Sequence, residues 1–405
     1  MTASWRNWGR NQSFNPSGIF RPASEDEAIE GMRAALRRGE RLRVAGSGHS
    51  FTPIVETDGV LVDLSRLSGV ITADTAQARV TVWAGSTIAS LGEPLWEQGL
   101  SIANQGDVDV QAIAGAVATG TTGSGIGFGS LSSAVTSMRI LNAAGEVVDV
   151  DASQPDHLAA AQVAIGLLGP VLRIGLQLVP AYGLREENTI LPMTEVLRQW
   201  DHLLQEYRHF SFWWMPSNRS ADMYKLGEVP ADHCFVKLLR EMPAAELPAT
   251  PGPANSRSDR AYRIYPDGTT EAEFHELEYM VPAQDAREAV EMLRHLMLNR
   301  FPDEISPLQV RWQRADSAFL SGQSGRDSVS LSVSGVIGQD YLPFLRAVDE
   351  ALRPFTARPH WGKLHFLDRD RLHEVYPSAG RFNRIRQDMD PEGRFLNPHL
   401  AELFG

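Results

Sequence analysis

The sequence predicts an α+β chain that folds as two domains or more. Its 405 residues are more than one ordinary hydrophobic core organises. The first part opens as a helix, a strand and a glycine turn, whereas two strongly alternating strands stand out in the later part. The hydrophobic fraction of 43% and the charged fraction of 22% are those of a globular protein.

Charge and cysteine content exclude several classes of function. The formal net charge of −12 argues against nucleic acid or an anionic membrane as the main partner, because such binding needs a basic surface. The single cysteine, Cys234, cannot form an intramolecular disulfide, and we expect no metal site. The first residues have no apolar run of signal-peptide length, and no later window has the length of a membrane span. We therefore expect a cytoplasmic protein.

The opening elements lead to a glycine turn. The run Ser24–Glu27 is a capping box for a helix that ends at Gly39, and a short strand with Leu42 and Val44 on one face follows. The strand runs into Gly-Ser-Gly-His at residues 46–49. Such a turn can leave backbone amides free to hold an anion, although most Gly-Ser-Gly sequences are only turns.

The next segments continue this pattern. Residues 60–64 and 79–83 are predicted strands, and Ser86 is the expected cap of a helix that ends at Gly99. Residues 103–125 are so rich in glycine, threonine and alanine that they suit close approach of backbone to a ligand, or equally a tightly packed loop. Their glycines do not form G-x-G-x-x-G, and the chain has no P-loop motif.

Two strands and a turn in the later part carry the polar side chains of interest. In residues 309–313 alternation places Gln309, Arg311 and Gln313 on one face, and in residues 328–334 it places four serines on one face. A row of serines beside an arginine suits the floor of a polar cavity, and the same pattern also suits a small solvent-exposed face. In the turn of residues 358–365, Lys363 could accept a proton, hold an anion or simply be solvated.

Five segments together resemble the aldonolactone oxidase and alditol oxidase branch of the vanillyl-alcohol-oxidase flavoprotein superfamily. The resemblance covers nearly the whole chain, in order. The segments are Val44–Phe51, Asn104–Thr121, Gln309–Arg311, Arg358–Lys363 and Asp390–Pro398.

The resemblance implies an architecture and a cofactor. It implies a two-subdomain FAD-binding domain at residues 1–182, a cap domain with a large antiparallel sheet at 183–373, and a C-terminal segment at 374–405 that returns to the FAD domain. By similarity, His49 would carry a covalent bond to the flavin 8α-methyl group. The cofactor-binding residues implied are Gly46, Ser47, Gly48, His49, Ser50, Gly106, Asp107, Gly115, Thr119, Gly120, Val171 and His360.

The resemblance also implies a reaction. The enzyme would oxidise a sugar-derived alcohol, an aldonolactone or an alditol, by hydride transfer from the carbinol carbon to flavin N5, and oxygen would reoxidise the flavin to give hydrogen peroxide. Arg311 and Lys363 match the family's cationic pair, which stabilises a developing alkoxide. The catalytic residues implied are Arg311, Lys363 and Gln309, and the substrate-binding residues are Asp107, Gln309, Arg311, Ser332, Ser334 and Lys363.

The chain departs from the family pattern at the site. Gln309 stands where the branch usually has a glutamate, and Thr122 replaces a histidine. Asp107 stands where the alditol enzymes have a serine, whereas Gly106 would leave room for oxygen beside the flavin. Two alternatives follow. One is a dehydrogenase that uses another electron acceptor, and the other is a flavin-binding protein that has lost its catalytic activity because position 309 carries an amide instead of a carboxylate.

Overall fold

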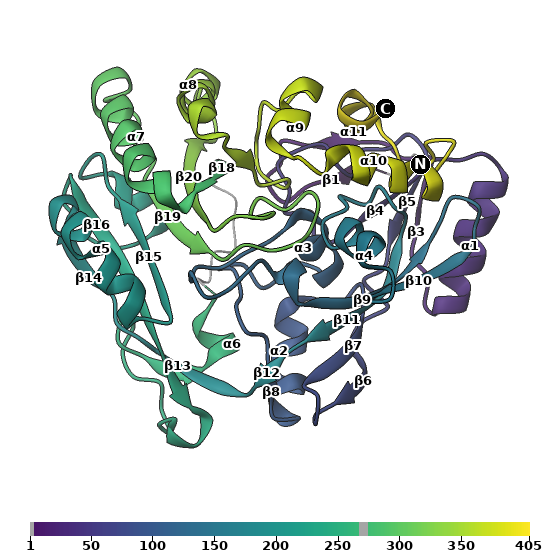
Figure 1. Cartoon of the computed structure of the whole chain (residues 1–405), viewed down its shortest axis with the longest axis horizontal. Helices are drawn as coiled ribbons and strands as arrows, with labels where there is room; N and C mark the ends of the chain where they lie inside the picture. Colours follow the sequence, from purple (N-terminus) through teal and green to yellow (C-terminus); the bar gives the residue numbers. More distant parts are fainter. Residues whose placement is uncertain (1–3, 267–273) are drawn as a thin grey trace.

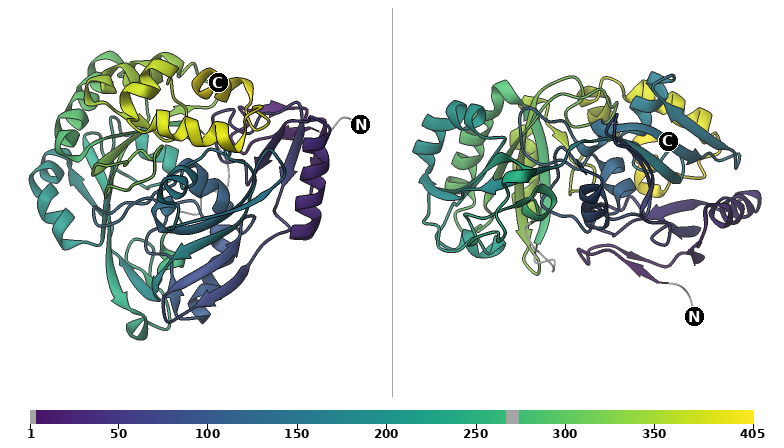
Figure 2. Two further views of the ribbon diagram at one scale, coloured as in Figure 1. Left: turned by 45° about the vertical axis from the view of Figure 1, so that its right-hand side comes forward. Right: turned by 90° about the horizontal axis from the view of Figure 1, so that it is seen from below.

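The computed structural model describes residues 4–266 and 274–405 of the chain. Two bodies of sheet lie side by side in Figure 1, one built mainly from the first part of the chain and one from the later part. The C-terminal helices lie on the same side as the N-terminal sheets, and the view from below in Figure 2 shows the same arrangement. Within the described ranges, every helix is too short or too polar to cross a lipid bilayer.

The N-terminal body contains a small parallel sheet and a five-stranded antiparallel sheet. Three of its helices join one large buried cluster with the C-terminal helices, whereas the first helix packs in a separate cluster with the parallel sheet. The parallel sheet has the order β3 (Gly18–Phe20), β5 (Val60–Asp63), β4 (Leu42–Ala45). The antiparallel sheet has the order β10 (Val147–Asp151), β9 (Val135–Leu141), β11 (Val171–Gln177), β7 (Arg79–Trp83), β6 (Val70–Asp74). The helices are α1 (Glu25–Arg37), α2 (Ile88–Glu97), α3 (Ile113–Thr119) and α4 (Pro155–Ala161).

Several short elements complete this body. Two-stranded pairs form between β1 (Trp5–Arg6) and β2 (Ser13–Phe14), and between β8 (Leu100–Ser101) and β12 (Val179–Pro180). The last helices are α9 (Arg369–Val375), α10 (Ala379–Met389) and α11 (Pro398–Phe404). Short 3₁₀ turns lie at Leu131–Ala134, Ser220–Tyr224, Ala244–Glu246, Ala283–Asp285 and Arg353–Phe355.

The second body is a nine-stranded sheet. Its neighbouring strands pair antiparallel throughout, and β14 (Thr189–Pro192) pairs with β16 beside the main path. The main order is β17 (Ser258–Arg260), β13 (Tyr182–Glu186), β16 (His233–Pro243), β15 (His209–Trp214), β19 (Leu308–Gln313), β20 (Ser328–Val336), β18 (Phe274–Pro282), β21 (Arg358–Pro359). The helices of this body are α5 (Met193–Glu206), α6 (Ala261–Ile264), α7 (Ala286–Arg300) and α8 (Leu342–Leu352).

Alternation along the strands gives this sheet one apolar and one polar face. Helices α5, α7 and α8 cover the apolar face, where Val310, Leu331 and Leu277 join one buried cluster (Figure 1). Because successive side chains point to opposite faces, the residues between them point to the other side, toward the N-terminal body. The serines of β20 lie on that polar face and are at most 1% exposed, so the alternative of a small solvent-exposed face is wrong.

Most predicted elements are confirmed, with two corrections. The Ser24 cap accepts a hydrogen bond from the amide of Glu27, as expected of a capping box. The second helix is capped by Thr87 rather than Ser86, whose hydroxyl instead donates to the carbonyl of Trp83. The small-residue segment at 103–125 is not loop throughout, because it contains α3.

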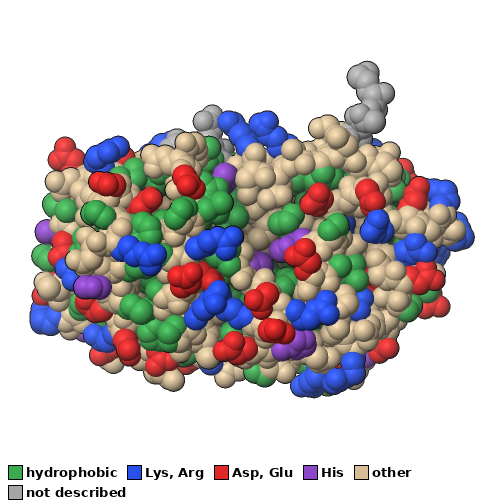
Figure 3. Space-filling view, turned by 90° about the horizontal axis from the view of Figure 1, so that it is seen from above, with side chains coloured by type: hydrophobic (Ala, Val, Ile, Leu, Met, Phe, Trp, Pro, Cys, Tyr) green, Lys and Arg blue, Asp and Glu red, His purple; other side chains and the backbone are tan. Residues whose placement is uncertain are grey.

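The outer surface carries both signs of charge. Acidic and basic side chains are interspersed across the face shown in Figure 3. Neither sign dominates this face.

Candidate active site

The turn after β4 presents an unsatisfied row of backbone amides. Among the described residues, none accepts a hydrogen bond from the amides of residues 47–50. Gly48 has φ +71°, and a Cβ there would come within 3.1 Å of the Trp5 ring, so this turn requires glycine. A concave row of free amides is suited to an anion such as a phosphate group.

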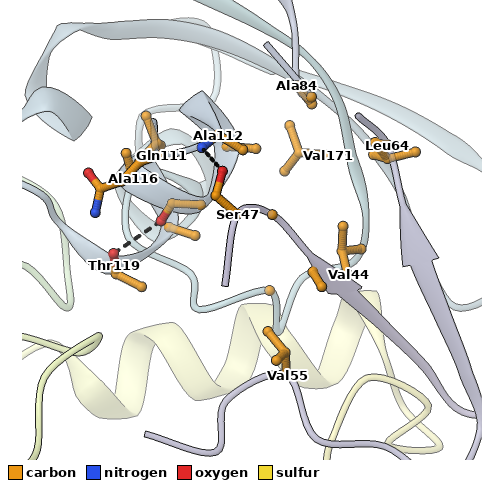
Figure 4. Close-up of a pocket in the computed structure, with 18 of the residues that line it drawn as sticks. Val44, Ser47, Val55, Leu64, Ala84, Gln111, Ala112, Ala116, Thr119 and Val171 are labelled. Carbon is orange, nitrogen blue, oxygen red and sulfur yellow. Dashed lines mark hydrogen bonds between the residues drawn. The ribbon is translucent and has the colours of Figure 1, made fainter. Parts of the chain in front are cut away.

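Helix α3 holds this turn in place. The Ser47 hydroxyl accepts a hydrogen bond from the amide of Ala112 at 3.1 Å, which ties the turn to the start of the helix (Figure 4). Gly120, predicted to bind the cofactor, ends the helix in the left-handed conformation with φ +75°. It therefore shapes the end of the helix rather than the wall of a cavity.

A first cavity of about 300 Å³ lies between the turn, α3 and strand β11. Val44, Ala84, Ala116 and Val171 give it an apolar wall in Figure 4. The predicted residues Gly46, Ser47, Gly48, His49, Ser50, Gly115, Thr119 and Val171 all line it.

A buried arginine also lines the first cavity, and it was missed in the sequence. The Arg43 guanidinium donates to carbonyls that include Phe395 and Ile165, at 2.6 and 2.7 Å. Its Nε has no acceptor among the described residues. Burial lowers its pKa to about 10, so it remains a cation at neutral pH.

A second, smaller cavity of about 120 Å³ continues from the first. The two cavities share His49, Ser50, Gln111 and Thr119 in their walls. Of the predicted residues, Gly106, Asp107, Gln309, Arg311, His360 and Lys363 line this second cavity. The structure thus brings together residues from positions 49 to 363.

His49 stands where the two cavities meet. Its ring stacks on Trp8 with centroids 4.7 Å apart, and both residues line the second cavity. Burial, with a smaller contribution from the charge of Lys363, lowers the pKa of His49 to about 4. The imidazole is therefore neutral at neutral pH, with a lone pair available on one ring nitrogen.

Both predicted cations have buried carboxylate partners on β18. Arg311 donates to Glu278 with Nη2 and Oε1 2.8 Å apart, and Lys363 donates to Glu276. Burial alone would raise the pKa of Glu278, but the charge of Arg311, helped by His360 and Lys363, lowers it to about 2. The pKa of Arg311 is raised correspondingly, chiefly by Glu278 against the opposing effect of burial.

A looser group surrounds Asp107. Its carboxylate lies 3.6 Å from the ammonium of Lys237 and 3.8 Å from Nη1 of Arg311. The amide of Gln309 donates to the same carboxylate at 3.4 Å. Nη1 of Arg311 also donates to the carbonyl of Thr122 at 3.2 Å. The backbone at position 122, where the family's histidine is absent, thus helps to hold the site arginine.

The remaining predicted residues take different places. The ring of His360 is buried, which lowers its pKa to about 4, and its Nδ1 accepts a hydrogen bond from the amide of Gly362. Ser332 and Ser334 lie behind the cavity wall: the Ser332 hydroxyl donates to Glu276, and the Ser334 hydroxyl bonds the Tyr224 hydroxyl at 2.7 Å. Both serines therefore form hydrogen bonds with residues that line the second cavity.

The sequence contained a signal for the missed carboxylates. In the segment Phe274–Pro282, Glu276 and Glu278 alternate with Leu277 and Tyr279, which marks a strand with an acidic face. Alternation alone could not reveal that this face meets Arg311 and Lys363.

Comparison with known proteins defines the class of the fold. The chain superposes on the crystal structure of cholesterol oxidase from B. sterolicum with a TM-score of 0.83, over 100% of this chain and 97% of that one, at 15% identity. The family model "FAD binding domain" matches residues 16–151. The chain therefore has the α+β fold of vanillyl-alcohol-oxidase flavoproteins and binds FAD.

Sequence comparison then gives the family. The family model "D-arabinono-1,4-lactone oxidase" matches residues 174–245 and 233–403, and the chain belongs to this family. It is 34% identical to L-gulono-1,4-lactone dehydrogenase of Mycobacterium tuberculosis over 100% of both chains. It is 29% identical to L-gulonolactone oxidase of Bos taurus, over 99% of this chain and 98% of that protein. It is 28% identical to alditol oxidase of a Streptomyces species, over 100% of this chain and 99% of that protein.

These matches confirm the resemblance inferred from the sequence motifs. The protein is an FAD-dependent oxidoreductase that acts on CH–OH donors, as predicted.

Proposed function

We propose that this enzyme oxidises a neutral sugar-derived alcohol, an aldonolactone or an alditol, with oxygen as electron acceptor and hydrogen peroxide as product. The observation that carries this proposal is the second cavity, in which Arg311 and Lys363 line a small polar space that opens onto the first cavity at His49. The names of the relatives support the substrate class, since they act on lactones and alditols.

The residues of the first cavity fit FAD. The free amides of residues 47–50 suit the diphosphate, and the aliphatic wall beyond them suits a flat aromatic group. In our proposal residues 1–182 form the FAD-binding domain, residues 183–373 the cap, and residues 374–405 the returning segment. The contacts of Arg43 with the carbonyls of Phe395 and Ile165 support a close return of the C-terminal segment.

We propose a covalent bond between His49 and the flavin. Support comes from the neutral imidazole at the junction of the cavities, because only a neutral ring has the lone pair that a new bond needs. The stacked Trp8 would hold the ring in one orientation. Acid precipitation of the purified protein tests this link: the yellow colour should stay with the pellet, and complete release of flavin would refute the link.

The chemistry requires removal of a hydride and a proton from one carbinol. FAD, when bound, supplies the hydride acceptor. Arg311 and Lys363 then have the task of stabilising negative charge as it develops on the substrate oxygen. Asp107 and Gln309, which line the same cavity, would orient the other hydroxyl groups by hydrogen bonds.

A dehydrogenase is the second candidate, favoured by the name of the Mycobacterium tuberculosis relative. Gly106 supports the oxidase, because an added Cβ would lie 3.3 Å from both Thr121 Cγ2 and the Thr122 carbonyl and would fill space there. Fast anaerobic reduction by substrate followed by slow reoxidation in air would select the dehydrogenase.

A lapsed enzyme is less well supported than Gln309 alone suggested. Glu276 and Glu278 supply two carboxylates within the same cavity wall, so the site does not lack acids. An oxygen-consumption screen of the holoprotein over polyols, aldonolactones and simple alcohols tests the proposal. We expect consumption with a lactone or a polyol. Failure of every compound to bleach the flavin would refute the proposed function.

A further inference from the structure

Among the described residues in the wall of the second cavity, carboxylates and imidazoles could accept a proton from the substrate. Oxidation of an alcohol releases the hydroxyl proton, and the amide of Gln309 cannot hold it at neutral pH. The candidates are the carboxylates Asp107, Glu276 and Glu278 and the imidazoles His49 and His360.

We propose that Glu276 is the catalytic residue that accepts the hydroxyl proton of the substrate, with Lys363 and Ser332 fixing its carboxylate. This inference rests on the proposed function. Ser332 donates to Oε1 of Glu276 and Lys363 donates to Oε2. Each carboxylate oxygen has two lone pairs, so one donor on each leaves capacity for a substrate hydroxyl.

The position of Glu276 suits direct contact with a substrate. Its side chain is 9% exposed, and Lys363 beside it is 23% exposed, so the pair forms part of the open cavity wall. Lys363 could therefore stabilise the alkoxide oxygen while Glu276 holds the proton that left it.

The other two carboxylates are less suitable. Glu278 is 1% exposed at its side chain, and Arg311 fixes it as a strong anion. Asp107 is already engaged by three groups, which are Lys237, Arg311 and the amide of Gln309.

The two imidazoles are also occupied. Nδ1 of His360 already accepts a hydrogen bond from the backbone, so its other nitrogen carries the hydrogen when the ring is neutral. His49 is the proposed attachment point of the cofactor. Among these described groups, Glu276 remains as the acceptor in the cavity wall whose two oxygens each hold one side-chain donor.

The O–H bond of the substrate breaks and its proton bonds to a carboxylate oxygen of Glu276, while the electron pair stays on the substrate oxygen. The carbinol carbon is oxidised, because its hydrogen leaves as a hydride that FAD, when bound, would accept. The electron pair left on the substrate oxygen then forms the second bond of the carbonyl group. Glu276 returns its proton to water when the product leaves.

Glu276→Gln in the flavin-loaded protein tests the assignment. Gln keeps the shape and the hydrogen bond from Ser332 but cannot take a proton. General-base catalysis contributes about 10²–10⁴-fold, so we expect anaerobic flavin bleaching at saturating substrate to slow by about 10²-fold or more, with a much smaller change in KM. A group that accepts a proton must be unprotonated, so the wild-type rate should fall at acid pH, and the variant should lose that acid limb.

Other ionisable groups near Glu276 could also affect how the bleaching rate depends on pH. Among the described residues, the charged and titratable groups that line the same cavity as Glu276 are Lys363, Arg311, Glu278, Asp107, His49, His360 and Tyr224. Because the pKa of Arg311 is raised and His49 and His360 stay neutral above a pH of about 4, an acid limb above that value does not come from these three groups.

Glu186→Gln is the matched control. Glu186 is a buried carboxylate in β13 of the same sheet, paired with Arg257 at 2.6 Å, and it lines neither cavity. The Glu186→Gln variant should be less stable than the wild-type protein, but its bleaching rate and the pH profile of that rate should be unchanged. Thermal unfolding of the same flavin-loaded variants separates effects on folding from effects on catalysis.

Glu276→Asp is a second variant that keeps the carboxylate. A displacement of about 1 Å can cost about 10²-fold in rate, so Asp should lower the rate while keeping the acid limb. A wild-type rate or a retained acid limb in Glu276→Gln, or an unchanged rate in Glu276→Asp, would overturn the assignment while the proposed function stands. Failure of wild-type protein to be bleached by any lactone or polyol would overturn both.

Discussion

Restoring the family's acid at position 309 should harm this protein. The family resemblance alone would suggest that Gln309→Glu repairs a weakened site. The structure argues the opposite, because Nε2 of Gln309 donates to Asp107 Oδ2 at 3.4 Å. A glutamate would place two carboxylate oxygens against each other in a wall that already holds Glu276 and Glu278.

The size of this effect follows from the separation. Two unit charges 3.4 Å apart repel by about 1 kcal/mol at the dielectric constant of water and by about 5 kcal/mol at an effective value of about 20. Asp107 is 26% exposed at its side chain, which places the pair between these limits. Arg311, 3.8 Å from the same oxygen, offsets part of the repulsion. We expect a loss of unfolding free energy between about 1 and 5 kcal/mol and no gain in turnover.

Urea unfolding at neutral pH measures the stability loss, and anaerobic bleaching measures turnover. The repulsion should weaken toward acid pH, where one carboxyl of the pair is protonated. Gln387→Glu, on the exposed side of α10, adds the same charge away from the site and should change stability by less than about 0.5 kcal/mol. If Gln309→Glu were as stable as wild type and more active, our description of the acids at this site would be refuted.

Three further predictions concern the same wall. Glu278→Ala leaves Arg311 buried without its partner and should cost about 3–5 kcal/mol in urea unfolding. The pKa of Glu278 is lowered from 4.5 to about 2 in the folded protein, so the stability that its carboxylate contributes should be complete above pH 4.5 and lost as the pH falls toward 2. Wild-type stability in Glu278→Ala would contradict this prediction. Arg311→Ala and Lys363→Ala should remain yellow but lose most of the reduction rate, and unchanged rates in both would contradict their roles. Gly106→Val should slow reoxidation in air more than reduction by substrate in stopped-flow traces, and equal effects on both half-reactions would argue against an oxygen-access role.

Local patterns in the sequence predicted the strands well. Alternation in residues 309–313 and 328–334 correctly predicted β19 and β20, because both strands separate an apolar core from a polar face. The small-residue segment was harder to interpret. Its glycines and threonines have low helix propensity, yet Ile113, Ala116 and Val117 are buried against the core and support α3 by tertiary packing.

Contacts between distant segments could not be predicted from local patterns. Trp8 is placed on His49 by the fold of the N-terminal segment, and no spacing in the sequence indicates that contact. The pairing of Glu278 with Arg311 depends on the strand order β18–β20–β19, in which a later strand lies between two earlier ones. Strand order is a property of the whole sheet, so neither residue could be assigned its partner beforehand.

The serines of β20 explain how these charges meet. In the register of the sheet, Ser332 lies opposite Glu278 on one side and opposite Gln309 on the other, and Ser330 lies opposite Arg311. Neighbouring strands are about 4.8 Å apart, so the backbones of β18 and β19 are separated by about 10 Å. A glutamate and an arginine can bridge that gap only if the side chains between them are short. The serines keep that space open and add hydroxyl donors, and the Ser332 hydroxyl fixes Glu276. The row that the sequence marks as unusual is therefore what allows Glu278 on one strand to reach Arg311 on the next strand but one.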